Sequence, residues 1–172
     1  MFCNGLTNQL FIFEKMIPVR KCLMVLIAVV FLGACRPMDL YEKTVFFSKQ
    51  EWDSQNQPSF NFEVKDSTTN YHIYVVIRHQ DAYHYNNLWL NIQTKGPGMQ
   101  AITQKLNLTL ANNTTGWLGS GMDDVFDHRI RITTVPIRMK KGVYQFTLQQ
   151  IMREDPLPYV LNAGIRIEKA KS

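Results

Sequence analysis

The feature that most constrains this chain is an alternation of apolar and polar residues that recurs in short runs along most of its length. The runs lie at 60–64, 71–78, 88–92, 106–110, 129–133, 144–149 and 161–168. Alternation with a period of two residues is typical of β-strands that bury one face. Turn-forming residues separate the runs at 66–70, 96–98, 112–116 and 140–142, as expected for strands joined by tight connections.

Long helical patterns are missing from the same region of the sequence. Two short segments, 121–126 and 150–154, are the parts of this region that could hold a helical turn. Parallel sheets need crossover connections, most of them helical, so an antiparallel arrangement is favoured. The sequence therefore predicts an all-β fold, an antiparallel β-sandwich of about seven to nine strands, of the jelly-roll or immunoglobulin-like type.

Composition fits one globular domain and narrows the possible partners. Of the 172 residues, 45% are hydrophobic and 19% are charged, which excludes a disordered or collagen-like chain. The formal net charge is +5, and the charges of both signs are interspersed after the first 34 residues. Nucleic-acid-binding proteins concentrate positive charge on one face, so we expect no nucleic-acid partner.

The N-terminal segment has the three parts of an export signal. Arg20 and Lys21 precede an apolar run at 22–32, and small residues follow at 33–34. The run is shorter than the ~20 apolar residues of a membrane-spanning helix. The sequence Leu-Gly-Ala-Cys at 32–35 resembles the lipobox of bacterial lipoproteins. That resemblance implies a cysteine that carries lipid, including palmitate, and becomes the first mature residue; the alternative is a signal anchor with an incidental cysteine.

Domain boundaries follow from this interpretation. We expect translation to start at Met16, the signal peptide to comprise 1–34, and Cys35 to be the lipidation site. Residues 35–43 are then a lipidated tether and 44–172 the sandwich domain. Arg36 follows the cysteine, with no acidic cluster after it, so we expect an outer-membrane lipoprotein that faces the periplasm.

Patterns for catalysis, metal binding or cofactor binding are missing from the sequence. The four histidines are scattered without metal-ligand spacing. Leu118 stands where a nucleophile elbow around Ser120 would need glycine. We therefore expect no metal, no cofactor and no enzymatic activity.

Three aromatic residues are candidates for binding a protein partner or a glycan. Tyr83 and Tyr85 lie in the polar loop 79–87, and Trp117 lies between flexible glycines. Exposed aromatic rings stack on sugars or anchor protein partners. The alternative for Trp117 is a wedge that closes one end of the sandwich.

Four charged residues are candidates for a structural contact. Asp123, Asp124 and Asp127 cluster after a glycine-rich stretch. They lack the alternating spacing of a calcium loop, and caps of a short helix are the favoured interpretation. Arg153 is a candidate partner that would pin this loop.

A weaker pattern concerns modification. Asp66, Ser67 and Thr68 resemble the short motif at which exported proteins of Bacteroidetes are O-glycosylated, with Ser67 as the candidate acceptor. A plain turn is the alternative interpretation.

Two longer segments carry a family resemblance. The first is Gly-Trp-Leu-Gly-Ser-Gly-Met-Asp-Asp-Val-Phe-Asp at 116–127, and the second runs from 144 to 169 and ends in Gly-Ile-Arg-Ile-Glu-Lys. With the lipobox and the strand at 88–90, they make the chain resemble the GldH gliding-motility lipoprotein family of Bacteroidetes over about 35–169. The resemblance implies a non-enzymatic envelope lipoprotein, without a cofactor, that works with gliding and type IX secretion proteins. The alternative function is a carbohydrate-binding module of the envelope that uses Tyr83, Tyr85 or Trp117.

Overall fold

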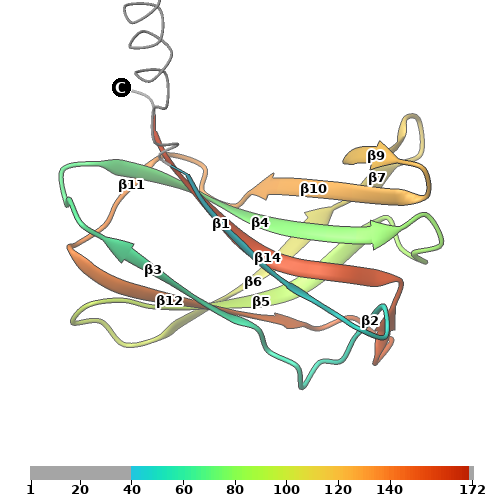
Figure 1. Cartoon of the computed structure of the whole chain (residues 1–172), viewed down its shortest axis with the longest axis horizontal. Coiled ribbons are helices and arrows are strands. Elements are labelled where there is room, and N and C mark those ends of the chain that lie inside the picture. The colour runs from blue at the N-terminus through green and yellow to red at the C-terminus, as the bar shows by residue number, and fades with distance from the viewer. Residues whose placement is uncertain (1–39, 171–172) are drawn as a thin grey trace, which may run out of the picture. The chain divides into compact units, whose positions relative to one another are not determined.

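The structure is a computed structural model and describes residues 40–170, which form strands and connecting loops (Figure 1). Eight strands have six residues or more: β1 (Leu40–Phe46), β3 (Ser59–Val64), β4 (Asn70–Gln80), β5 (Asn87–Lys95), β6 (Ile102–Thr109), β10 (Val125–Arg131), β12 (Gly142–Gln150) and β14 (Val160–Lys169). The short strands are β2 (Glu51–Trp52), β7 (Ala111–Asn112), β8 (Gly116–Trp117), β9 (Ser120–Met122), β11 (Ile137–Arg138) and β13 (Leu157–Pro158). The prediction of an all-β fold is confirmed.

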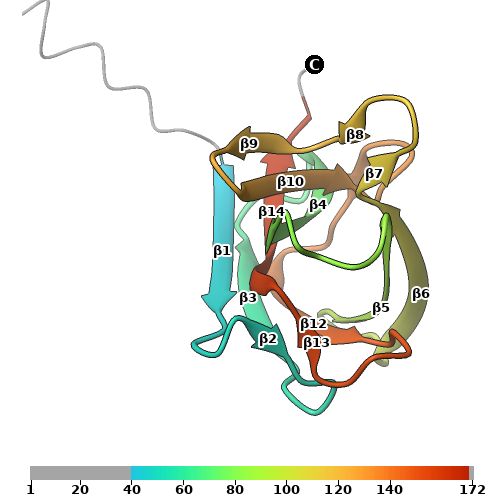
Figure 2. The ribbon, with the colours of Figure 1, turned by 90° about the vertical axis from the view of Figure 1, so that its right-hand side faces the viewer.

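The long strands form two antiparallel sheets that lie face to face (Figures 1 and 2). Sheet I has the order β1-β14-β4-β10-β9, with β11 also on β4, and sheet II has the order β3-β12-β5-β6. Counted along the chain, the eight long strands pair first with eighth, second with seventh, third with sixth and fourth with fifth. This nested pairing is that of a jelly roll. Of the two sandwich types left open by the sequence, the strand order selects the jelly roll.

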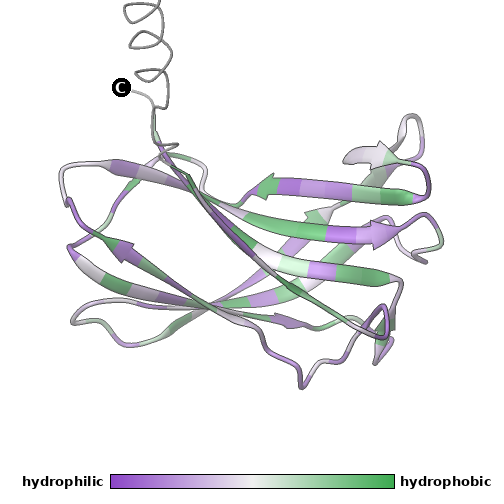
Figure 3. Ribbon diagram, viewed as in Figure 1, coloured by the Kyte–Doolittle hydropathy of each residue, from purple (hydrophilic) through white to green (hydrophobic). Residues whose placement is uncertain are grey.

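The core lies between the two sheets, where the apolar residues of each alternating strand meet. Figure 3 shows hydrophobic and hydrophilic residues alternating along the strands. Sheet I contributes Ile73, Val75 and Ile77 from β4 and Ala163, Ile165 and Ile167 from β14, all at most 5% exposed. Sheet II contributes Leu88, Leu90 and Ile92 from β5 and Tyr144, Phe146 and Leu148 from β12. Burial of these faces is the main stabilising term of the fold.

The structure departs from the predicted elements in three places. Residues 121–126 form the β9–β10 hairpin instead of a helical turn, because Met122 pairs with Val125 across a two-residue connection. Asp123 has φ of 56° there, a left-handed conformation that aspartate tolerates in tight turns. The second place is 150–154, where β12 ends at Gln150 and the residues after it form no helical turn. The buried Gln150 amide donates to the Trp52 carbonyl and to Asp155 there. In the third, β1 begins at Leu40, so four residues expected in the tether pair with β14.

A buried histidine pair joins β4 to β10. The Nε2 atoms of His79 and His128 lie 2.9 Å apart, and the two residues are 0% and 3% exposed. His79 Nδ1 donates to the carbonyl of Gln80 at 2.8 Å, so its Nε2 is the acceptor and His128 Nε2–H is the donor. Burial lowers the pKa of His79 and lowers that of His128 to about 4. Both imidazoles are therefore neutral at pH 7.

This pair should make stability sensitive to mild acid. The folded-state pKa of each histidine lies below the unfolded value of about 6.5, so the unfolded state binds protons first as the pH falls. The stabilisation is present above about pH 6.5 and is lost towards pH 4. We expect the free energy of unfolding, measured by urea titration, to fall by about 2–3 kcal/mol between pH 6.5 and 4.5.

The contribution of the pair can be separated from that of other groups. His128→Gln keeps a donor for His79 but cannot be protonated, so this variant should lose the part of the pH dependence that His128 contributes, while the part from the buried His79 remains. His72→Gln alters a histidine on the outer side of β4 and serves as the matched control. Equal slopes of unfolding free energy against pH in the wild type and His128→Gln would contradict the assignment.

Gly164 lies opposite Thr44 of β1, at a point where the two strands leave no room for a side chain. A Cβ at Gly164 would collide with the carbonyl oxygen of Lys43 and lie 2.8 Å from Thr44 Cα. We expect Gly164→Ala to push β1 away and lower the free energy of unfolding by about 2–4 kcal/mol. Asn162→Ala, in the same strand and half-buried, is the control. Unchanged hydrogen exchange of the β1 amides in Gly164→Ala would rule the explanation out.

Candidate functional site

The strand register defines two ends of the sandwich. Leu40 is opposite Glu168, and Tyr71 is opposite Lys169, so the described chain begins and ends at one end, which we call the tether end. At the other end Val125 is opposite Gln80, and the β9–β10 hairpin lies there (Figure 1). We call this the far end.

Trp117 packs at the far end against the buried histidine pair. Its ring centroid lies 4.4 Å from that of His79 and 5.7 Å from that of Phe126. The indole Nε1 donates to Asp81 Oδ1 at 2.7 Å. A Cβ on Gly119 would lie 2.6 Å from the Asp127 carbonyl oxygen and 2.8 Å from His128 Nε2. Trp117 thus covers His79 at this end of the sandwich, as the wedge interpretation expects. Gly119 lies where the loop passes so close to His128 that a side chain would not fit.

The two candidate tyrosines have different surroundings. Tyr83 is 5% exposed and its hydroxyl donates to the Asn87 carbonyl at 3.1 Å. Its pKa is raised well above the usual value, chiefly by burial. The expectation that Tyr83 offers an exposed ring is therefore wrong, because the 79–87 loop folds this side chain inward. Tyr85 is half-buried, and its hydroxyl donates to Glu154 Oε2 at 3.3 Å.

The aspartate cluster makes a contact different from the predicted one. Asp127 accepts two hydrogen bonds from Arg78, each of 2.7 Å, and this pairing lowers the pKa of the Asp127 carboxyl. Asp127 is directly opposite Arg78 in the β4–β10 register, so the predicted pairing of Asp127 with Arg153 is wrong. Asp123 and Asp124 form the turn of the β9–β10 hairpin, and Arg153 lines a pocket beside Trp89.

Of the two predicted modification sites, Ser67 lies within the described residues and Cys35 does not. Ser67 is exposed in the β3–β4 turn, where Asp66 accepts hydrogen bonds of 2.8 Å from both the backbone nitrogen and the hydroxyl of Thr68. This turn leaves the Ser67 side chain accessible, and its glycosylation stays a prediction. Cys35 lies outside the described residues.

The outer faces of the two sheets differ in charge. On sheet I, Glu42 accepts hydrogen bonds of 3.0 and 2.8 Å from Arg129 and Arg166. These partners lower the pKa of the Glu42 carboxyl, Arg129 contributing most. Arg166 also pairs with Glu168. The charges on this face are therefore largely paired with one another.

The outer face of sheet II instead carries mainly amides and hydroxyls. Gln149, Asn91 and Lys105 are aligned across β12, β5 and β6, and Thr147, Gln93 and Thr103 form the next row. Trp89, 37% exposed, is the large apolar residue of this face of β5.

Two pockets lie on this face. A pocket of about 360 Å³ is lined by Tyr85, Asn87, Trp89, Lys105, Ile151, Met152 and Arg153. A second pocket of about 60 Å³ is lined by Gln57, Asn91, Gln93, Thr103, Thr147 and Gln149. The sequence holds a signal for the position of Trp89: it alternates with the buried Leu88 and Leu90, which places its side chain on the opposite, outer face of β5.

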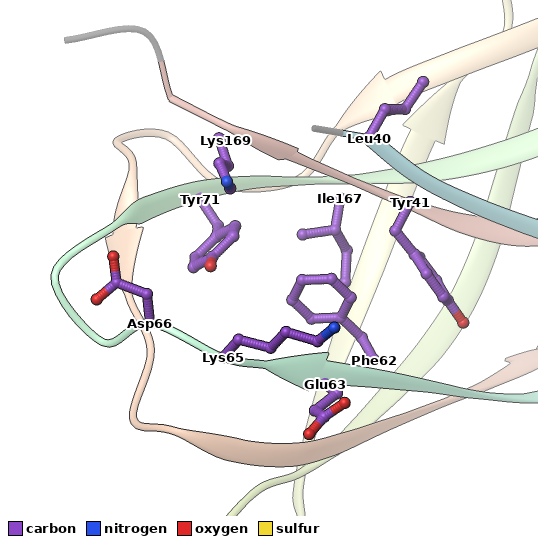
Figure 4. A pocket seen from close by; sticks show the side chains of 9 residues that line it. All are labelled: Leu40, Tyr41, Phe62, Glu63, Lys65, Asp66, Tyr71, Ile167 and Lys169. Carbon is purple, nitrogen blue, oxygen red and sulfur yellow. The ribbon is translucent and has the colours of Figure 1, made fainter. Parts of the chain in front are cut away.

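A third pocket, of about 240 Å³, lies at the tether end. Figure 4 shows Phe62, Tyr71 and Ile167 side by side within it, with Tyr41 at its edge and Lys65 extended across it. The ring of Phe62 lies 5.3 Å from that of Tyr41 and 5.6 Å from that of Tyr71, both edge to face. These aromatic contacts link Tyr41 of β1 and Tyr71 of β4 to Phe62 of β3 along the wall of the pocket.

Within residues 40–170, no group of three or more histidine, cysteine, aspartate or glutamate side chains is placed to hold a metal ion. Over the same residues, the structure has no helix with the length and apolarity needed to cross a membrane.

Comparisons with known proteins identify the family. The chain is 26% identical over 149 residues to a protein of Christiangramia forsetii named gliding motility lipoprotein GldH homolog, covering 83% of this chain and 91% of that protein. It is 25% identical over 154 residues to gliding motility lipoprotein GldH of Flavobacterium johnsoniae, covering 84% and 93%. A structure of infectious bursal disease virus Gx strain aligns at 12% identity over 80% of this chain and 38% of that one, with a TM-score of 0.18, too low to support any argument. The GldH lipoprotein model matches residues 39–167, and the chain therefore belongs to the GldH lipoprotein family.

Proposed function

We propose that this protein is a lipid-anchored, non-enzymatic binding domain that contributes to a gliding-motility and type IX secretion assembly in the cell envelope. The single observation that carries the proposal is the family match over residues 39–167. The names of its relatives connect that family with gliding motility. A role in binding rather than catalysis agrees with the buried histidine pair, in which both ring nitrogens of His79 and the Nε2 of His128 already form hydrogen bonds within the protein.

The geometry of the domain suits work at a membrane surface. Cys35 precedes Leu40 by five residues, which span at most about 18 Å when extended. A lipid on Cys35 would hold the tether end near the bilayer. Strand β4 has eleven residues and spans about 36 Å between the two ends. The far end is thus the part of the domain that reaches furthest from the anchor.

The far end also offers apolar side chains to a protein partner. Leu118 and Met122 are 51% and 79% exposed on the segment that carries Trp117. Neighbouring exposed apolar groups are a common mark of protein interaction sites. We propose that this end contacts another envelope protein of the assembly, and that the anchor is in the outer membrane with the domain facing the periplasm.

Removal of the anchor tests the first part of the proposal. In cells that produce the protein, Cys35→Ala should abolish incorporation of labelled palmitate, release the protein from the outer-membrane fraction and impair spreading and secretion. Cys22→Ala, within the signal, is the matched control and should retain all of these properties. Continued palmitate labelling of Cys35→Ala would refute the anchor, and an unaltered cell phenotype would refute the role in the assembly.

Charge placed at the far end tests the second part. Leu118→Glu and Met122→Glu should reduce cross-linking to envelope partners and impair spreading by at least about tenfold, because a carboxylate disrupts an apolar contact. Val135→Glu changes a side chain that is 66% exposed outside this segment and is the control. If all three variants behave alike, the far end is not the contact surface.

A further inference from the structure

The outer face of sheet II is a second surface that the far-end contact does not use. We propose that this face binds a saccharide that carries an anionic group, with Trp89 as the platform for a sugar ring. The site comprises the pocket beside Trp89 and the adjoining pocket of amides and hydroxyls. This inference is independent of the role in gliding and secretion.

The chemistry of the smaller pocket favours a ligand rich in hydroxyl groups. All six of its lining residues are glutamine, asparagine or threonine. Each amide has two donor hydrogens and an acceptor oxygen, so such a surface can bond to sugar hydroxyls in either direction. A peptide or lipid surface would call instead for apolar pockets or paired charges.

These polar groups are held in place by contacts with one another. Asn87 Nδ2 donates to Asn107 Oδ1 at 2.7 Å, and Asn91 Nδ2 donates to Gln149 Oε1 at 3.4 Å. Ser59 and Thr147 hydroxyls lie 2.7 Å apart. Asn91 and Gln149 use part of their hydrogen-bonding capacity in this way and keep the rest for a ligand. The rows lie on strands rather than on loops, which preserves their spacing.

Trp89 supplies the apolar platform at one end of these rows. Its indole is 37% exposed, and its backbone nitrogen donates to Met152 Sδ at 3.2 Å, which fixes the strand beside the pocket. Aromatic rings combine apolar area with a defined stacking plane. Tyr85 lines the same pocket, so one of the three aromatic residues singled out in the sequence belongs to the site.

Charge complementarity identifies the anionic part of the ligand. Lys105 and Arg153 both line the Trp89 pocket, and within residues 40–170 neither forms an ion pair with a carboxylate. Glu154, next to Arg153 in the chain, is instead bonded by His84 and Tyr85. Lys105 Nζ lies 4.8 Å from the centroid of the Trp89 ring, and its flexible stem lets it move to a carboxylate or phosphate.

A glycan array tests this proposal. Full-length protein in detergent is applied to an array of oligosaccharides that contain uronate, sialate or phosphorylated sugars, together with neutral hexose and N-acetylhexosamine oligomers. We expect binding to acidic glycans that exceeds binding to neutral ones by at least about tenfold. Trp89→Ala should weaken that binding by about tenfold or more, a ratio typical of a lost aromatic contact at a binding site.

Further variants and one competitor complete the test. Lys105→Ala and Arg153→Ala should each reduce the preference for acidic glycans. Phe46→Ala, which removes a 62% exposed ring from sheet I, is the matched control and should bind as the wild type does. No binding to any acidic glycan, or binding that Trp89→Ala leaves intact, overturns the proposal. Displacement by a heptaglutamate peptide at the same concentration also overturns it, because that result indicates an unspecific cation patch.

Discussion

The pairing of β14 with both β1 and β4 is the interaction on which the rest of this structure depends. β14 contributes Ala163, Ile165 and Ile167 to the core while it joins the first described strand to the central one. Because the last long strand lies beside the first, the chain enters and leaves the domain at one end. The same pairing leaves the far end to hairpins and loops, which can vary in sequence without loss of the sheets. Gly164 is needed at this junction because a Cβ there would collide with the backbone of the neighbouring strand β1.

Two-residue periodicity then determines how the outer surfaces are divided. Each long strand gives one face to the core, so its other face is released from packing and can specialise. On sheet I, Arg129, Arg166 and Glu42 form a connected set of ion pairs. On sheet II, the equivalent positions hold amides, hydroxyls and Trp89. Neither arrangement is required by the fold, since exposed ion pairs contribute little to stability and exposed amides contribute no buried apolar area.

Much of this architecture could be predicted from the sequence, because burial of one face leaves a periodic signal. The runs at 71–78 and 161–168 lie within β4 and β14. The sequence does not predict the start of strand β1 at Leu40, because Leu-Tyr-Glu-Lys-Thr-Val-Phe lacks strict alternation. This strand lies at the edge of sheet I and its second half is exposed, so burial of one face leaves little pattern in it. Pairing between distant residues left no local signal, so the partner of Asp127 and the burial of Tyr83 emerged from the structure. The two histidines are 49 positions apart, and only the β4–β10 register brings them together.

An anchor on Cys35 would change what counts as a useful affinity for such a domain. A protein confined to a membrane surface meets other surface-bound molecules at an effective concentration set by its tether, which reaches millimolar values for short linkers. Contacts that are weak in solution are then occupied much of the time. The saccharide site and the proposed protein contact use different side chains, Trp89 with Lys105 for the first and Leu118 with Met122 for the second, so both could be engaged together. The affinity for two ligands held in the same assembly would then exceed the affinity of either contact alone, because the rigid β-sheets keep the two sites at a constant separation.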